Sequence, residues 1–253
     1  MLLLPTLALA MKFSAHEHCP LMRCAMRLAE QRPGLVLDVG ANGGCETHMA
    51  LTMGRRVVAV ECLASAYAEL LAEPKLRTHR NLTLLHACAG ESVNVSKLHL
   101  ASDSSSLDAQ NVATSQEAAK AAKEWQARGT RDESVVVVPG DLLLPPEARV
   151  ALVKVDVQGT EYSVLAGLRG TLKQHQPVVT FEHARNLAGY KNRWSQERGN
   201  ATRDILEPLG YRCYIDFVDY VCLPRDHALL QRGAGRAAKG AFPCNKDRKG
   251  LYT

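Results

Sequence analysis

The stretch from residue 36 to residue 61 constrains the fold of this chain more than any other feature. An apolar run at 36–39 includes Asp38 and ends at the turn Gly40-Ala41-Asn42-Gly43-Gly44, and a second apolar run at 57–60 ends at Glu61. Two such runs, joined by a glycine-rich turn and a segment of helix length, are typical of the first half of a Rossmann-like nucleotide fold. In that fold the ligand binds at the carboxyl ends of the strands, where glycine lets the backbone approach it closely.

The spacing of the glycines indicates which nucleotide binds. A dinucleotide fingerprint reads Gly-x-Gly-x-x-Gly, and Asn42 stands here at its middle glycine. Asp38, two residues before Gly40, suits a ligand with a cationic end, such as the sulfonium and amino group of S-adenosylmethionine, and would repel a pyrophosphate. Glu61, about 20 residues past the turn, is placed to accept hydrogen bonds from ribose hydroxyls. The motif favours a methyl donor, and a nicotinamide-dependent oxidoreductase is the alternative.

Length and charge limit the partners of the chain. Its 253 residues fit one α/β domain, and 46% hydrophobic and 23% charged residues are ordinary for a globular protein. Residues 224–253 hold seven basic and two acidic residues, which accounts for the whole net charge of +5. We therefore predict a basic C-terminal tail. Because the expected catalytic face is not basic, nucleic acid is not the expected partner.

The compartment stays open between cytoplasm and secretory pathway. Residues 1–10 form an apolar run that ends in Ala-Leu-Ala, as before a signal-peptidase site, but the run has no positive start and is too short to span a bilayer. Residues 1–33 are thus an N-terminal segment, either a short signal or a helix. Sequons begin at Asn81, Asn94 and Asn200. The oligomeric state is open as well.

The eight cysteines are scattered along the chain. No Cys-x-x-Cys pair occurs, so we expect no zinc site and no other metal. Cys213 and Cys222 would face each other across a hairpin, although buried free thiols are the commoner state.

Strands and helices alternate along most of the chain. The apolar pattern predicts strands at 35–39, 57–61, 82–88, 135–138, 150–155 and 177–181, with a short exposed strand at 93–100. It predicts helices at 18–31, 44–53, 64–72, 161–173 and 201–209, and a final hairpin at 211–216 and 217–223. Residues 101–133, with a helix at 116–127, interrupt the rhythm as an insertion that forms a lid or a surface excursion. The expected fold is α/β, a mostly parallel sheet with an antiparallel C-terminal hairpin.

A second motif, Lys154-Val155-Asp156-Val157-Gln158-Gly159-Thr160-Glu161, follows the strand at 150–155. Together with the glycine turn and Glu61, it resembles the FkbM-type family of S-adenosylmethionine-dependent methyltransferases. The resemblance covers residues 34–223 and implies the Rossmann-like sandwich of class I methyltransferases. Gln158 stands where the family usually has Glu, which removes one carboxylate from the site.

The resemblance implies methyl transfer from S-adenosylmethionine to a hydroxyl of a sugar or another small molecule. Asp156 is the leading catalytic carboxylate, with capping of the following helix as its alternative role. His183 is a candidate general base, because imidazole titrates near neutral pH, and Glu182 would orient it or meet the acceptor. A nucleoside-binding module without turnover is the competing function.

The expected donor-binding residues lie at the carboxyl ends of the first three strands. Those of the glycine turn and of the second strand would shape the methionine and ribose sites, and those after the third strand would contact adenine. The full set is Asp38, Gly40, Asn42, Gly44, Glu61, Cys88 and Ala89.

Overall fold

The structure is a computed structural model that describes residues 20–99, 107, 132–182, 193–216, 219–232 and 243–244. The signal-like run at 1–10, the helix predicted at 116–127 and His183 lie outside the described residues.

The described chain alternates strands and helices much as the sequence predicts. The strands are β1 (Leu35–Val39), β2 (Val57–Glu61), β3 (Leu82–His86), β4 (Cys88–Gly90), β5 (Asn94–Leu98), β6 (Glu133–Pro139), β7 (Val150–Val155), β8 (Val178–Glu182), β9 (Tyr211–Asp216) and β10 (Asp219–Pro224). The helices are α1 (Pro20–Leu28), α2 (Cys45–Thr52), α3 (Ala64–Ala72), α4 (Pro74–Arg77), α7 (Glu161–Ala166), α8 (Arg169–His175), α9 (Arg193–Leu206) and α10 (Ala228–Gln231), with short 3-10 helices η2 (Gly140–Leu143) and η3 (Glu207–Leu209).

Seven strands form one sheet in the order β3-β2-β1-β7-β8-β10-β9. The first five of these are parallel, and β10 pairs antiparallel with both β8 and β9. The mostly parallel sheet with an antiparallel C-terminal hairpin is therefore confirmed. Because β1, β2 and β7 are parallel neighbours, their carboxyl ends meet at one edge, where the glycine turn and Asp156 come together.

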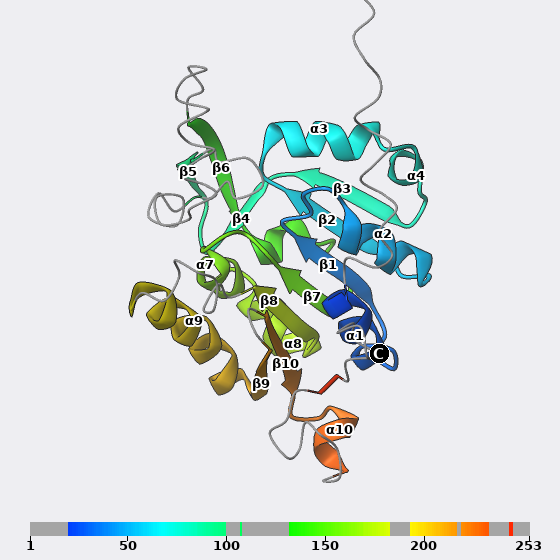
Figure 1. The fold of residues 1–253 in the computed structure, drawn as a ribbon, viewed down its shortest axis with the longest axis vertical. Coiled ribbons are helices and arrows are strands. Elements are labelled where there is room, and N and C mark those ends of the chain that lie inside the picture. Colours follow the sequence, from blue (N-terminus) through cyan, green and yellow to red (C-terminus); the bar gives the residue numbers. More distant parts are fainter. Residues whose placement is uncertain are drawn as a thin grey trace, which may run out of the picture.

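Helices cover both faces of this sheet (Figure 1). Alternate apolar residues of each strand point to opposite faces, so that Leu37 and Val179 pack with α7, α8 and α9, whereas Val36 and Val178 pack with α1 and α2. This alternation also fixes where the polar residues go. Asp38 and Lys154 pair in register and share the α1 and α2 face.

The β4, β5 and β6 strands depart from the simple alternation. They form a separate three-stranded sheet in the order β4-β6-β5, so the valine run at 135–138 does not join the main sheet. One side of this small sheet faces outward: Val95 and Val136, which pair in register, are 76% and 57% exposed. Four consecutive valines are typical of a buried strand, and sequence alone does not show that Val136 is exposed while Val137 is buried.

Both terminal segments contribute to the fold. Helix α1, inside the predicted N-terminal segment, buries Met22, Ala25 and Met26 against the sheet. In the predicted tail, the imidazole of His227 hydrogen-bonds to the Leu28 carbonyl at 2.9 Å, and Cys244 is disulfide-bonded to Cys24.

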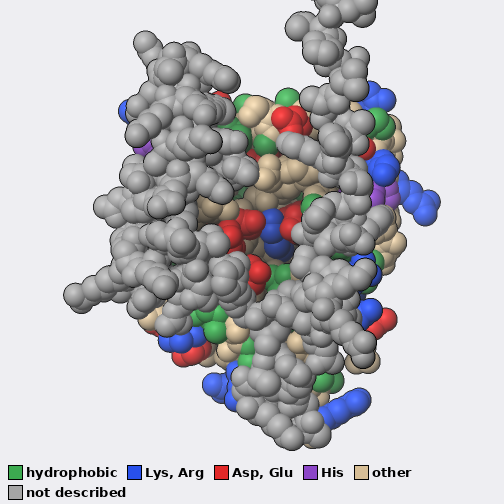
Figure 2. All heavy atoms as spheres, viewed as in Figure 1, with side chains coloured by type: hydrophobic (Ala, Val, Ile, Leu, Met, Phe, Trp, Pro, Cys, Tyr) green, Lys and Arg blue, Asp and Glu red, His purple; other side chains and the backbone are tan. Residues whose placement is uncertain are grey.

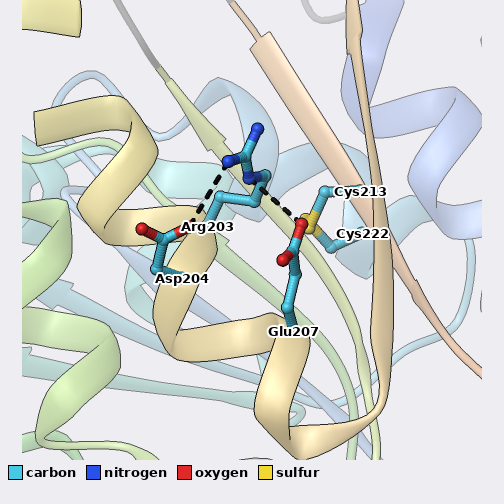
Figure 3. The surroundings of a disulfide bond; sticks show 5 residues. All are labelled: Arg203, Asp204, Glu207, Cys213 and Cys222. Atoms are coloured by element: carbon cyan, nitrogen blue, oxygen red, sulfur yellow. Dashed lines mark hydrogen bonds and ion pairs between the residues drawn. A yellow bond between two sulfur atoms is a disulfide. The ribbon is translucent and has the colours of Figure 1, made fainter. Parts of the chain in front are cut away.

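All cysteines of the described residues are disulfide-bonded. Cys62 pairs with Cys88, and Cys213 pairs with Cys222, directly opposite it on the β9–β10 hairpin. Figure 3 shows this hairpin disulfide near the end of α9, where Arg203 pairs with Asp204 and Glu207. Free thiols were the commoner expectation for such buried cysteines, and the facing positions on adjacent strands explain the difference.

Candidate functional site

The glycine turn bends back sharply over the end of β7. Gly40 has φ of 81°, and a Cβ at this position would lie 1.8 Å from the Asp156 carbonyl oxygen, so only glycine fits. Asn42 also has a positive φ, 41°, a conformation that asparagine tolerates better than most residues. The turn therefore brings the ends of β1 and β7 into contact.

Glu61 fixes the turn from the end of β2. Its carboxylate accepts hydrogen bonds from the Asn42 amide at 2.7 Å and from the Leu63 amide at 2.8 Å. Burial raises the pKa of Glu61, and these two backbone amides act in the opposite direction. Each oxygen keeps a lone pair for a further donor, so the carboxylate is held ready to accept bonds from a ligand hydroxyl.

A cleft opens beside Glu61, and we call it the glycine-loop cleft. Six of the residues expected at the site line it: Gly40, Asn42, Glu61, Cys88, Ala89 and Asp156. Leu63, Leu98 and Leu107 add apolar surface. Gly44 is not among the lining residues. It lies directly before α2 and has a φ of 78°.

Asp38 lies behind the wall of the cleft. It has no exposed surface, accepts a hydrogen bond from the Thr47 hydroxyl at 2.6 Å, and forms an ion pair with the Lys154 ammonium at 3.2 Å. Lys154 in turn donates to the Gly40 carbonyl at 2.8 Å. The sequence analysis expected Asp38 beside the amino end of the donor. In the structure its carboxylate instead contacts Thr47 and Lys154, and Lys154 links it to the Gly40 carbonyl of the glycine turn.

Lys154 is a site residue that the sequence analysis did not single out. Burial lowers the pKa of its ammonium, but Asp38, Glu46 and Asp156 outweigh burial and raise the pKa well above its usual range. The signal in the sequence was a lone lysine in the otherwise apolar run at 150–155. A buried lysine needs a charge partner, and the acid at the matching position of the neighbouring strand is that partner.

Gln158 joins two acids at the ends of neighbouring strands. Its amide donates to Asp156 Oδ1 and to Glu182 Oε2, both at 2.8 Å. Burial, then the nearby Asp156, raises the pKa of Glu182 to about 9, so Glu182 is protonated at neutral pH. The structure thus brings Asp156 and Glu182 together through the Gln158 amide.

Glu161 closes the same turn from below. It is the first residue of α7 and accepts hydrogen bonds from the amides of Gly159 at 2.9 Å and Val157 at 3.3 Å, so it stabilises the turn that precedes the helix. Burial raises the pKa of Glu161 to about 7.

A second cavity of about 540 Å³ lies on the α1 and α2 side of the sheet end. We call it the acidic cavity, because four carboxyl groups and one ammonium line it: Glu46, Asp156, Glu182, Asp219 and Lys154. Figure 2 shows acidic side chains around a basic one in a hollow near the centre of this face. Asp156 lines both the acidic cavity and the glycine-loop cleft.

Within the described ranges, no group of three His, Cys, Asp or Glu side chains could hold a metal ion. Over the same residues, no helix is both long and apolar enough to cross a membrane.

The sheet order, the glycine turn and the acid at the end of β2 define a Rossmann-like fold of the class I methyltransferase type. The family model described as "Methyltransferase FkbM domain" matches residues 38–213. The chain therefore belongs to the FkbM methyltransferase family, whose methyl donor is S-adenosylmethionine.

Solved structures with a similar course of the chain are distant in sequence. The methyltransferase FkbM from Methylobacillus flagellatus KT is 18% identical, with 75% of this chain and 42% of that chain covered and a TM-score of 0.47. A precorrin-6y C5,15-methyltransferase from Geobacter metallireducens GS-15 is 14% identical, with coverages of 79% and 84% and a TM-score of 0.42. The glycopeptide N-methyltransferase MtfA, solved with S-adenosyl-L-methionine, is 15% identical, with coverages of 65% and 54% and a TM-score of 0.34. No curated protein matches the chain.

Proposed function

We propose that the chain transfers a methyl group from S-adenosylmethionine to a hydroxyl oxygen of a small molecule or sugar. The observation that carries the proposal is the place of Asp156, which lines both the glycine-loop cleft and the acidic cavity. With the donor in the cleft and the acceptor in the cavity, the two substrates would meet at this carboxylate.

The residues of the glycine-loop cleft fit the donor. Glu61 offers acceptors for the ribose hydroxyls, and its two backbone hydrogen bonds hold it in place. Cys88, Ala89 and Leu98 give apolar surface for the adenine ring, and the carboxylate of Asp156 suits a positive charge. When bound, S-adenosylmethionine supplies a methyl group on a positively charged sulfur.

The transfer requires a base near the acceptor oxygen. A bond forms between that oxygen and the methyl carbon, the carbon–sulfur bond breaks with its electron pair going to sulfur, and the hydroxyl proton must leave. Glu182 does not suit the role of base at neutral pH, because its pKa of about 9 keeps it protonated. Asp156 is our proposed proton acceptor, with His183 as the second candidate.

A binding module without turnover is the second candidate function, and Gln158 is the observation in its favour. The Gln158 amide occupies one oxygen of Asp156 and one of Glu182. The nicotinamide-dependent alternative, in contrast, is at odds with membership of a methyltransferase family.

Two measurements on the purified chain test the proposal. Calorimetric titration with S-adenosylhomocysteine measures donor-site binding, and methyl transfer over a library of hydroxyl compounds measures turnover. We expect Asp156→Asn to lower turnover by about 10²-fold or more while the Kd for S-adenosylhomocysteine changes by less than about threefold. Asp204→Asn, which removes an exposed carboxylate from α9, is the matched control. Equal losses of affinity and turnover would remove Asp156 from the chemistry, and binding without turnover on any acceptor would favour the binding module.

A further inference from the structure

Lys154 is a buried charge in a strand that is otherwise apolar. The other residues of β7 are valine, alanine and leucine, and Lys154 is only 8% exposed. In register it stands between Asp38 on β1 and Thr180 on β8, and Thr180 also lines the acidic cavity. A buried ammonium is unfavourable unless partners compensate it, so the contacts of this ammonium indicate what it does in the sheet.

The ammonium of Lys154 faces three groups that belong to different parts of the site. It donates to the Gly40 carbonyl at 2.8 Å, and it lies 3.2 Å from Asp38 Oδ1 and 3.9 Å from Asp156 Oδ2. Burial lowers the pKa of the ammonium, but the nearby carboxylates outweigh burial, so the group is charged at neutral pH. An ammonium has three N–H donors and can face all three groups at once. Lys154 therefore connects the glycine turn to the carboxylate that follows β7.

Two of these three partners line the glycine-loop cleft. Gly40 and Asp156 are both lining residues, whereas Lys154 lies behind them and is not one. The carboxylate of Asp156 is held from two sides, because Gln158 donates to its Oδ1 at 2.8 Å and Lys154 lies beside its Oδ2. Lys154 thus acts on the cleft through the residues that it contacts.

The stability of the sheet does not by itself require a lysine at this position. Backbone hydrogen bonds already join the ends of β1 and β7, since the Asp156 amide donates to the Val39 carbonyl at 3.0 Å. Replacing a buried ion pair by apolar side chains of similar size is often neutral or even stabilising. The contacts of Lys154 with Gly40 and Asp156 therefore have a different consequence from its pairing with Asp38.

We propose that Lys154 is a positioning residue for methyl transfer, which holds the Gly40 carbonyl and the Asp156 carboxylate in one arrangement and so aligns the donor with the proton acceptor. The proposal rests on the function proposed above and deepens it. The effect of Lys154 on the donor passes through the glycine turn, and its effect on proton transfer passes through Asp156.

Lys154→Met tests this role in the full chain. Methionine has an unbranched side chain of similar length and carries no charge. We expect the Kd for S-adenosylhomocysteine, measured by calorimetry without an acceptor, to rise about tenfold, because the glycine turn loses its preorganised geometry. At saturating donor, kcat should fall further, by about 10²-fold, because Asp156 is no longer aligned. The melting temperature should fall as well, since Asp38 is left as a buried charge without its cation.

A double variant separates the positioning role from stability. Asp38→Asn/Lys154→Met removes both charges of the buried pair, so the melting temperature should return toward that of the wild type. The losses of affinity and turnover should remain, because the contacts with Gly40 and Asp156 are still absent. Recovery of affinity and turnover together with the melting temperature would show that Lys154 serves only the fold, and would overturn the proposal.

Two further variants complete the test. Lys154→Arg keeps the positive charge, and Lys154 borders the acidic cavity, which leaves room for a guanidinium. We expect it to stay within about threefold of the wild-type Kd, and a folded Lys154→Arg no better than Lys154→Met would overturn the proposal. Thr171→Val is the matched control: it removes a buried hydroxyl that donates to Asp141 at 2.6 Å, and should lower the melting temperature without changing the Kd.

The two proposals fail in different ways. A wild-type chain that does not bind S-adenosylhomocysteine would contradict the proposed function. Affinity and turnover that are as high in folded Lys154→Met as in the wild type would leave the proposed function standing and overturn the role of Lys154 alone.

Discussion

Gln158 links the carboxyl groups of Asp156 and Glu182. The FkbM-type family usually has Glu at this position. Its φ of 56° turns the side chain back toward the sheet, and its amide donates to both Asp156 and Glu182. An amide can donate two hydrogen bonds at once, which a carboxylate cannot do. The departure from the family pattern therefore has a structural consequence: it lets two neighbouring acids share one donor group.

Replacement of Gln158 by Glu should destabilise the fold, and more so at high pH. The variant loses both donated bonds and adds a like charge beside Asp156, so we expect the free energy of unfolding to fall by about 1–3 kcal/mol at pH 8. The loss should be smaller at pH 5, because the neighbouring Asp156 raises the pKa of the added carboxyl and a larger share of it is protonated at pH 5 than at pH 8. Urea unfolding at both pH values measures this. Gln158→Leu, which removes the donors without adding charge, should show a loss that does not vary with pH, and a pH-independent loss in Gln158→Glu would contradict the charge argument.

Glu182 should make the stability of the wild-type chain depend on pH. Its pKa is raised from its ordinary value near 4.5 to about 9 in the folded state, so the folded state binds the proton more tightly than the unfolded state does. The contribution of Glu182 to the free energy of unfolding is therefore greatest below about pH 4.5, and it is lost as the pH rises toward 9.

Glu182→Gln removes this dependence. We expect the difference in unfolding free energy between pH 5 and pH 9 to be smaller in the variant by at least about 1 kcal/mol, since one unit of pKa corresponds to about 1.4 kcal/mol. Glu161, whose pKa is about 7, titrates in the same range in both proteins, so only the difference between them is informative. The same slope in Glu182→Gln and wild type would show that Glu182 is ionised in the folded state; Glu91→Gln serves as an exposed control.

At the scale of elements, the sequence predicted strand positions best where a short apolar run lies between polar residues. The strands at 57–61 and 150–155 begin and end where the apolar pattern predicts, because a strand between two helical layers needs apolar residues on both faces. The helix predicted at 161–173 is instead divided into α7 and α8. A Cβ at Gly167 would lie 1.8 Å from the Gly90 carbonyl oxygen, so the chain bends there to let β4 approach, a tertiary contact that helical periodicity does not contain.

The sequence predicted the glycine-loop cleft but not the acidic cavity, because the cavity also depends on tertiary contacts. The glycine-loop cleft follows from two local motifs, and its predicted lining residues are adjacent to strand ends. The acidic cavity depends on the strand order, which places β10 beside β8 and thereby brings Asp219 to Glu182. Nothing local in the sequence at Glu46, Thr180 or Asp219 distinguishes them from ordinary helix or strand residues.

The Cys62–Cys88 disulfide joins the end of β2 to β4 within the wall of the glycine-loop cleft. Cys62 directly follows Glu61, so the bond restrains the carboxylate proposed to bind ribose. We expect a Cys62→Ser/Cys88→Ser variant to bind S-adenosylhomocysteine about three- to tenfold more weakly by calorimetry, because the cleft loses its preorganised geometry.

The hairpin disulfide gives the matched control for this prediction. Cys213→Ser/Cys222→Ser removes a disulfide from β9 and β10, away from the residues that line the cleft, and should leave the affinity unchanged while lowering the melting temperature. Equal losses of affinity in the two variants would mean that both act through overall stability.

At the scale of the whole molecule, the Cys24–Cys244 disulfide connects α1 to the C-terminal segment, two parts of the chain that the sheet does not join. Disulfides persist mainly in oxidising compartments and are rare where glutathione keeps thiols reduced. Since all described cysteines are paired, we expect the chain to reach its full stability only when it folds under oxidising conditions. Residue spacing did not reveal the Cys24–Cys244 pair, because its two cysteines are 220 positions apart.

The Cys24–Cys244 disulfide should contribute more to stability than Cys62–Cys88 or Cys213–Cys222. It closes a separation of 220 residues, and the entropy removed from the unfolded chain grows with the size of the closed loop. Both cysteines are buried, at 1% and 8% exposure, so the bond also holds the C-terminal segment against α1. We expect Cys24→Ala/Cys244→Ala to lower the free energy of unfolding by about 2–5 kcal/mol. The loss should exceed that of Cys213→Ala/Cys222→Ala, whose separation is only 9 residues. Urea unfolding of both variants under identical oxidising conditions measures the difference, and an equal or smaller loss for the 24–244 pair would show that the C-terminal segment is held by other contacts.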